Sequence, residues 1–362
     1  MSKRWILLPV VLGLVALAQP AAAVQYTFLD AAFVQQIYTG PLVGGPGMAW
    51  TANGHLLTRN GASIIEYDPL ASAVHQGTNV HPSITTHVIT GLATSGYGIS
   101  NGSDGYLYIG TGNGLQRVDP TTWTVTTPFA NLPGIPNTVG MGGGYGVTTL
   151  PNGKIVYVAG GGTNELYIYD PVALTNNLIY TATGLIDDIE SSPTGEIALA
   201  GQANNNVIII TATGAVLVTV PTTAFPDGLA FGYGAAANKL FSNDNQGTIT
   251  QYDFVAGYTS LITSSTVASG GSYGDLAAVG PDCALYVSQF FNNGFHGSAN
   301  FGTRWDNNTV NNEPSIVRIA SSTPGVCAFA PSGHDVPEPG VGWLALAGLS
   351  ALALLRRRRP RA

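Results

Sequence analysis

The apolar residues of this 362-residue chain fall into two long runs near its ends and many short segments between them. The short segments are rich in Val, Ile, Thr and Tyr, and turns containing Gly, Asn, Pro and Asp separate them. The first group of residues favours β-strands and the second favours tight turns. The pattern predicts an all-β domain of short strands, which we place at residues 24–330.

The short segments recur as a three-part repeat. A small apolar segment is followed by a turn with a second strand, such as DGYLYIG, and then by a third strand, such as GLQRVDP. The first part occurs six times, as PGMAW, YGISN, YGVTT, DDIES, DGLAF and GDLAA, beginning at Pro46, Tyr97, Tyr145, Asp187, Asp227 and Gly274. The period of about 40 to 50 residues is that of a propeller blade. The repeat therefore predicts a six-bladed β-propeller.

The last blade lacks sequence for a fourth, outer strand. The segment FVQQIYTG, from Phe33 to Gly40, precedes the first blade and has the character of the other outer strands. We expect it to pair with the last blade and close the ring, which removes an exposed strand edge. A pair of β-sandwiches and a seven-bladed ring are the alternative folds.

The apolar run at the beginning predicts an N-terminal signal peptide, residues 1–23. Lys3 and Arg4 precede the run from Trp5 to Ala18, and the small residues Ala21 to Ala23 follow as a cleavage site. The alternative is a permanent membrane anchor, which the shortness of the run disfavours. The mature chain would begin near Val24, outside the cytoplasm.

The apolar run at the end predicts a C-terminal transmembrane helix, residues 340–355. It contains no charged residue, and as a helix it would be about 24 Å long, which is short for a bilayer but sufficient if the bilayer thins. Residues 356–362 carry five arginines, which the positive-inside rule assigns to the cytoplasm.

A Pro-Glu-Pro triplet, Pro337, Glu338 and Pro339, ends the predicted linker 331–339 directly before this helix. The order of triplet, short helix and arginine cluster resembles the PEP-CTERM sorting signal of Gram-negative bacteria. The resemblance implies that the membrane protease exosortase recognises the triplet and removes the helix. The protein would then pass from a transient inner-membrane anchor to the cell surface or the extracellular matrix, where extracellular polysaccharide is a candidate partner. An ordinary tail anchor is the alternative.

Charge is scarce in the rest of the chain. Outside the signal peptide and the arginine tail, six basic residues stand against 20 acidic ones. Such a domain has no basic face for nucleic acid or anionic lipid. Cations and neutral sugars are the partners that its composition favours.

Phrases such as PDGLAF and LAAVGPDCALYVSQ resemble those of the six-bladed, calcium-dependent family of gluconolactonase and SMP-30, and of NHL-type propellers. The resemblance implies a metal at the channel mouth, held by a Glu of the first blade and by Asn and Asp of later inner strands. Asp227 matches the Asp position, and the Asn position falls near Asp187 or Asp188. The first blade reads GGPGMAW and has no Glu, so the ligand set is incomplete.

Asp188, Asp227 and Asp275 each stand at the start of an innermost strand and are therefore candidate metal ligands. With carbonyls and waters, three converging carboxylates would suit Ca2+. The alternative is that they cap turns or accept hydrogen bonds from backbone amides. The six histidines have no metal-ligand spacing, and no catalytic residue is assigned.

Two further features concern the last blade. Cys283 and Cys327 are the only cysteines, and in an exported chain we expect them to form a disulfide rather than remain free. An insertion between Gln289 and Ser315 carries Arg304, Trp305 and Asp306, a plausible surface for stacking on a sugar ring. The insertion serves equally well as a purely structural loop.

Two classes of function follow. The preferred one is an exported surface or matrix protein whose propeller is a non-catalytic binding platform. The alternative is a metal-dependent, lactonase-like hydrolase that uses Asp188, Asp227 and Asp275 as ligands and a bound water as nucleophile.

Overall fold

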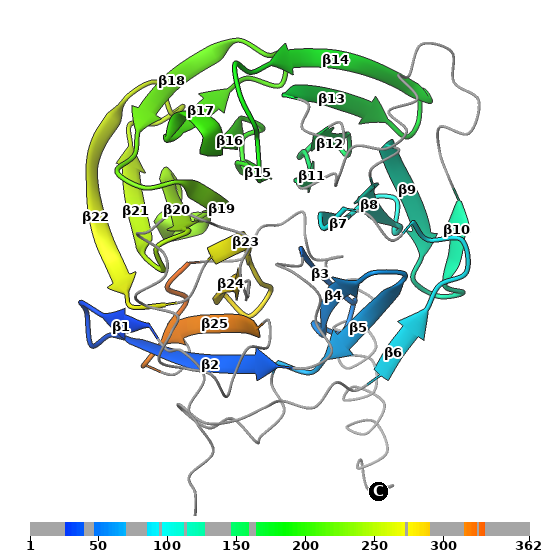
Figure 1. Cartoon of the computed structure of the whole chain (residues 1–362), viewed down its shortest axis with the longest axis horizontal. Coiled ribbons are helices and arrows are strands. Elements are labelled where there is room, and N and C mark those ends of the chain that lie inside the picture. The colour runs from blue at the N-terminus through cyan, green and yellow to red at the C-terminus, as the bar shows by residue number, and fades with distance from the viewer. Residues whose placement is uncertain are drawn as a thin grey trace, which may run out of the picture.

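The structure is a computed structural model, and it describes residues 26–39, 47–69, 85–93, 96–111, 114–126, 146–158, 164–271, 274–289, 315–323 and 326–329. Within these residues six antiparallel sheets stand around a central channel like the blades of a propeller (Figure 1). The predicted six-bladed all-β fold is confirmed.

The first three blades each contain four strands, in order from the channel outward. Blade 1 has β3 (Met48–Trp50), β4 (Leu56–Asn60), β5 (Ser63–Tyr67) and β6 (Thr85–Val88). Blade 2 has β7 (Ile99–Asn101), β8 (Leu107–Thr111), β9 (Gly114–Asp119) and β10 (Thr124–Thr126). Blade 3 has β11 (Val147–Thr149), β12 (Ile155–Val158), β13 (Glu165–Asp170) and β14 (Thr175–Thr181).

The other three blades follow the same order, and blade 5 gains a fifth strand. Blade 4 has β15 (Ile189–Ser191), β16 (Ile197–Gly201), β17 (Asn206–Ile210) and β18 (Val216–Pro221), with the short helix η1 (Gln202–Asn204) between β16 and β17. Blade 5 has β19 (Pro226–Phe231), β20 (Lys239–Asp244), β21 (Ile249–Phe254), β22 (Leu261–Ser269) and β1 (Thr27–Phe28), with η2 (Gly234–Ala236) after β19. Blade 6 has β23 (Gly274–Val279), β24 (Leu285–Gln289), β25 (Ser315–Ser321) and β2 (Phe33–Thr39).

The ring closes through β2, as the sequence predicts. This strand pairs antiparallel with β25 over its whole length, from Phe33 opposite Ser321 to Thr39 opposite Ser315. The sequence analysis did not predict β1, which pairs with the end of β22 in the preceding blade. The N-terminal segment therefore holds blades 5 and 6 together.

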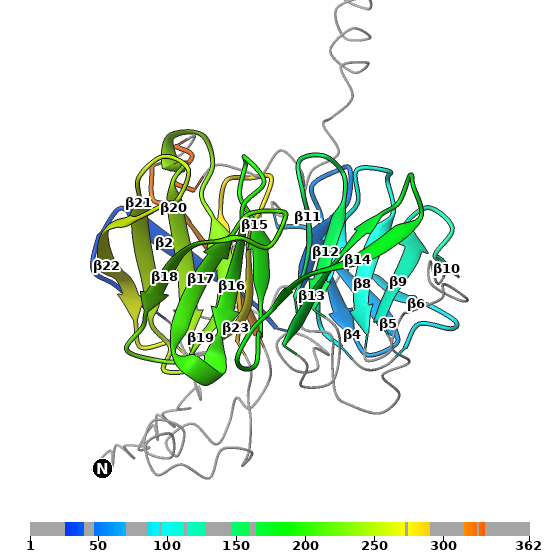
Figure 2. The same cartoon turned by 90° about the horizontal axis from the view of Figure 1, so that it is seen from above.

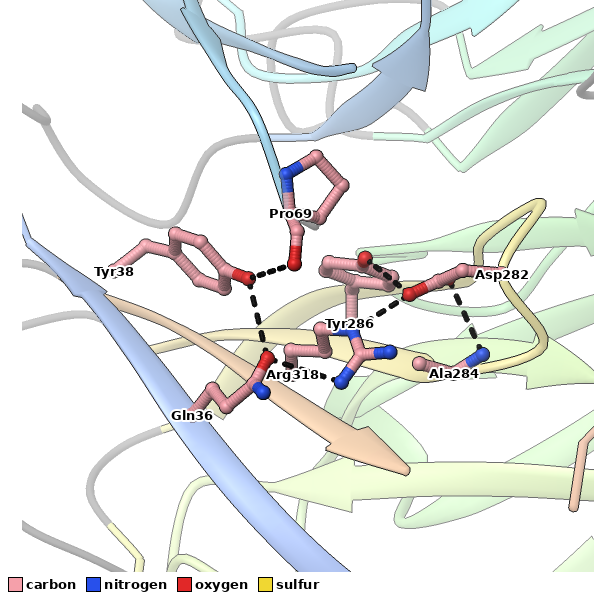
Figure 3. A network of polar contacts seen from close by, with 7 residues as sticks. All are labelled: Gln36, Tyr38, Pro69, Asp282, Ala284, Tyr286 and Arg318. Carbon is pink, nitrogen blue, oxygen red and sulfur yellow. Dashed lines mark hydrogen bonds and ion pairs between the residues drawn. The ribbon is translucent and has the colours of Figure 1, made fainter. Parts of the chain in front are cut away.

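A buried polar network secures this closure (Figure 3). Arg318 of β25 donates from Nε to Asp282 Oδ2 at 2.6 Å and from Nη1 to Gln36 Oε1 of β2 at 2.9 Å. The Tyr286 hydroxyl donates to the same Asp282 oxygen at 3.0 Å, and the Tyr38 hydroxyl donates to the Pro69 carbonyl of blade 1 at 3.4 Å. The first blade, the last blade and the N-terminal strand thus meet in one set of contacts.

Apolar residues fill the spaces between blades. Among the described residues six core clusters occur, and each joins two neighbouring blades. Both faces of a blade are therefore covered, which explains why β8, β16 and β24 are buried at every position instead of alternating.

Polar side chains link the innermost strands around the channel. The Asn101 side chain both donates to the Trp50 carbonyl at 2.7 Å and accepts from the Trp50 N–H at 2.8 Å, joining blades 2 and 1. The Ser191 hydroxyl donates to the Thr149 carbonyl at 2.8 Å, joining blades 4 and 3. These bonds fix the positions from which the channel-facing side chains project.

Candidate metal centre

Three carboxylates meet at the face of the ring where the innermost strands begin, which we call the mouth face. Asp187 lies two residues before the start of β15, Asp227 is the second residue of β19, and Asp275 is the second residue of β23. One oxygen from each lies within 4.8 Å of the other two. Blades 4, 5 and 6 thus each contribute one acidic side chain to a single point.

Gln202 of η1 holds two of these carboxylates. Its Nε2 donates to Asp187 Oδ2 at 3.1 Å and to Asp227 Oδ1 at 2.8 Å. Helix η1 follows β16, so it lies on the mouth face beside the start of β15. The amide fixes the two acids in place from within blade 4.

Two of the three carboxylates are buried, which makes their negative charge unfavourable, and Asp275 is partly buried. Asp187 is 7% exposed and Asp227 is 1% exposed. Burial raises the pKa of Asp187 to about 7. A cation at this point would offset the charge and would favour the ionised form.

The group fits a hard divalent cation. Calcium binds carboxylate oxygens at about 2.3–2.6 Å, so two oxygens on one ion lie at most about 5 Å apart. The separation of 4.8 Å or less meets this limit. Asp187, Asp227 and Asp275 would hold the ion, and waters or carbonyls would complete its shell of about six to eight oxygens.

The sequence analysis named Asp188 where the structure has Asp187. Asp188 accepts hydrogen bonds from the backbone N–H groups of Ile189 (2.9 Å), Leu229 (2.8 Å) and Ala277 (3.4 Å). It therefore ties the inner strands of blades 4, 5 and 6 together, as in the alternative of backbone hydrogen bonding. Because consecutive side chains of an extended chain point in opposite directions, only one of the two acids reaches the mouth.

Burial also raises the pKa of Asp188 well above its ordinary value, although its three backbone hydrogen bonds act in the opposite direction. Next to it, a channel cavity of about 20 Å³ is bordered by Glu190, Ser100 and Asp188. That volume is enough for about one water molecule. The channel wall below the mouth is thus acidic and narrow.

Of the other residues singled out in the sequence, the structure describes the two cysteines but not the insertion residues or the sorting triplet. Cys283 and Cys327 form a disulfide in the structure. Arg304, Trp305 and Asp306 lie outside the described residues, as do Pro337, Glu338 and Pro339 and the predicted signal peptide and tail helix. Among the described residues, none of the helices has the length and apolar character needed to cross a membrane.

Sequence spacing missed one polar cluster on blade 1. His55 Nδ1 and His87 Nε2 each hydrogen-bond a different oxygen of Glu66, at 2.6 and 2.9 Å, and Trp123 of blade 2 stacks on His87 with ring centroids 3.6 Å apart. Burial favours the neutral form of Glu66, but the two imidazole contacts outweigh it and lower its pKa. Strand pairing unites residues that the sequence separates, so no short motif indicates this cluster.

Comparison with known proteins finds one matching sequence family and several solved structures of similar fold. Residues 335–359 match the family model of the PEP-CTERM protein-sorting motif. No curated protein sequence matches the chain.

Solved propeller structures resemble the fold at low sequence identity. A calcium-binding protein, regucalcin, from Agrobacterium tumefaciens is 15% identical, with a TM-score of 0.54 over 85% of this chain and 97% of that one. A luciferin-regenerating enzyme is 13% identical, with a TM-score of 0.54 over 82% of this chain and 98% of that one. Virginiamycin B lyase from Staphylococcus aureus is 11% identical, with a TM-score of 0.50 over 80% of this chain and 99% of that one. At these identities the likeness concerns the fold alone.

Proposed function

We propose that this chain, which carries the PEP-CTERM protein-sorting motif at residues 335–359, is an exported surface or matrix protein whose propeller is a non-catalytic, calcium-binding module. The motif implies export and exosortase sorting to the cell surface. The finer steps are part of the proposal: loss of residues 1–23, recognition of Pro337, Glu338 and Pro339 by the protease, and removal of the apolar tail.

The observation that carries calcium binding is the approach of Asp187, Asp227 and Asp275 to within 4.8 Å of one another. Each acid comes from a different blade, so an ion there would also bond blades 4, 5 and 6 together. An exported protein meets calcium at the millimolar level that weak extracellular sites need, about 10⁻⁴ to 10⁻³ M. Calcium would then stabilise the mouth face as a platform for extracellular partners, with polysaccharide as the candidate class.

One observation favours a second candidate function, metal-dependent hydrolysis of a lactone-like substrate. Three carboxylates leave part of the shell of a bound ion to water, and a metal-bound water is the nucleophile that such hydrolysis needs. We rank this function second because the first blade, GGPGMAW, offers no acidic ligand.

Calorimetric calcium titration of the purified protein tests the proposal. We expect the unaltered protein to bind one calcium ion and Asp227→Asn to lose that binding. Asp119→Asn removes an equal charge from an exposed turn of blade 2 and should leave binding intact. Failure of the unaltered protein to bind calcium at millimolar concentration would refute the proposed site.

A screen of lactones with the calcium-loaded protein separates the two functions. A binding module should show no turnover above that of the Asp227→Asn variant. Turnover that needs calcium and disappears in Asp227→Asn would establish the hydrolase instead.

A further inference from the structure

The propeller has two different faces, and the chain leaves it at the face opposite the carboxylates. The innermost strands begin at the mouth face and end at the opposite face, which we call the tail face. The turns between the first and second strands of all blades, including the one with Cys283, lie on this tail face. Figure 2 shows the segment after β25, in orange, at the upper edge of the ring, and the turn between β16 and β17, in bright green, at the lower edge.

The turns of the tail face share one backbone requirement that Cys283 meets at a cost. A residue with positive φ stands two positions before the buried part of each second strand: Gly54, Gly105, Gly153, Gly195, Asn238 and Cys283. Glycine adopts this left-handed conformation freely, whereas a residue with a β-carbon loses about 1 kcal/mol or more. Cys283 has φ of 64° in the place of a glycine, so its value there lies in its bond to Cys327.

Noncovalent contacts hold the end of the described chain at the same face. Phe329 is completely buried, and its ring lies 5.5 Å from that of Phe33 and 4.8 Å from that of Phe241. Its carbonyl accepts a hydrogen bond at 2.9 Å from the N–H of Tyr233, which lies two residues after the end of β19. The chain up to Phe329 is therefore fixed to the tail face by a disulfide, by packing and by a backbone bond.

Only seven residues, 330–336, separate Phe329 from the Pro-Glu-Pro triplet. Fully extended they reach about 25 Å. A blade is about as tall as its strands of five to six residues, which is about 17–20 Å. A path from the tail face down the rim to the mouth would use most of this reach, whereas an exit on the tail side uses little of it, so the length of the linker favours a triplet on the tail side.

We propose that the tail face is directed toward the membrane that holds the uncleaved tail, and that the carboxylate mouth is directed away from it. The orientation rests on the proposed sorting function, because it requires a membrane-held tail. A partner of the mouth then approaches from the extracellular side, and the processing protease acts beside the tail face. The Cys283–Cys327 bond passes any pull on the tail directly to blade 6.

Two matched variants report the orientation. Ala52 lies in the turn beside Gly54 on the tail face, and Ala203 lies in η1 beside Gln202 on the mouth face; both are exposed. We would introduce Ala52→Cys or Ala203→Cys into the full chain with Pro337, Glu338 and Pro339 replaced by alanine, so that the tail is retained. The native cysteines are bonded to each other, so a thiol-reactive donor dye labels only the new position.

The labelled proteins are inserted into liposomes whose lipids carry an acceptor dye. We expect a larger loss of donor fluorescence for Ala52→Cys than for Ala203→Cys, and equal donor fluorescence for both in detergent without acceptor. Equal energy transfer from both positions, or more from Ala203→Cys, would overturn the orientation while leaving the sorting proposal standing. No transfer from either position would show that the tail does not hold the protein at a bilayer, which would overturn both.

Discussion

At the scale of single residues, two adjacent acids have different tasks. Asp187 joins the carboxylate group at the mouth, and Asp188 accepts three backbone hydrogen bonds from three inner strands. The sequence predicts that acids at these strand starts matter, since the repeat aligns them. It does not indicate which of the pair faces the mouth, because that depends on the direction of one side chain relative to two other blades.

The two roles predict losses of stability of different size on substitution. Asp188→Ala leaves the N–H groups of Ile189, Leu229 and Ala277 without their acceptor, and each buried unsatisfied group costs about 1–3 kcal/mol. We therefore expect a loss of about 3 kcal/mol or more in the free energy of unfolding, measured by urea denaturation without calcium. Asp187→Asn should lose much less, since it removes an unfavourable buried charge. Equal losses would contradict this division of roles.

The raised pKa of Asp187 predicts a pH dependence of stability in calcium-free protein. Burial moves this pKa from an ordinary 3.8 to about 7, so between these values the folded state holds a proton that the unfolded state has lost. The free energy of unfolding should therefore fall as pH rises from about 4 to about 7. The Asp187→Asn variant should show a shallower fall in urea titrations across this range. Parallel curves for the two proteins would show that Asp187 is not the group responsible.

At the scale of elements, the repeat and the closing strand could be predicted because they depend on local pattern. Phe33 to Thr39 resembles an outer strand, and only the last blade lacks one. The addition of β1 to blade 5 could not be foreseen, because two residues carry no periodicity and their pairing with Ser269 and Ala268 depends on the finished ring. The partners of Arg318 were equally hidden, since Gln36 is 282 residues away.

The closure network predicts a sensitive position in β25. Arg318 and Asp282 form a largely buried ion pair, and removing one partner of such a pair typically costs about 3–5 kcal/mol. We expect Arg318→Met to reduce the free energy of unfolding by about that amount. Lys154→Met is the control, because its more exposed pair with Asp170 should contribute about 1 kcal/mol or less. A similar loss of stability in both variants would argue against a special role for the Arg318–Asp282 pair in the closure of the ring.

At the scale of the whole molecule, the PEP-CTERM motif at residues 335–359 implies export and sorting of the propeller to the cell surface. If the Pro-Glu-Pro triplet is a protease signal, replacing all three residues by alanine should leave export and insertion intact, because the apolar run and the arginines are unchanged. The altered protein should accumulate in the inner membrane with its tail attached, whereas the unaltered protein should lose residues 340–362. Cell fractionation with one antibody against the propeller domain, residues 24–330, and another against residues 340–362 shows in which fraction each protein lies and whether it keeps its tail. Retention of the tail by both proteins in the same membrane fraction of the native host would identify an ordinary anchor.

The most direct test of the account is a crystal structure of the mature protein isolated from the native host in calcium-containing medium. We predict a chain that begins near Val24 and ends at or before Pro339. At the mouth, an ion should lie about 2.3–2.6 Å from oxygens of Asp187, Asp227 and Asp275. A mature chain with those ends whose three carboxylates surround only water, still joined by Gln202, would contradict the central claim that this exported propeller carries a calcium site.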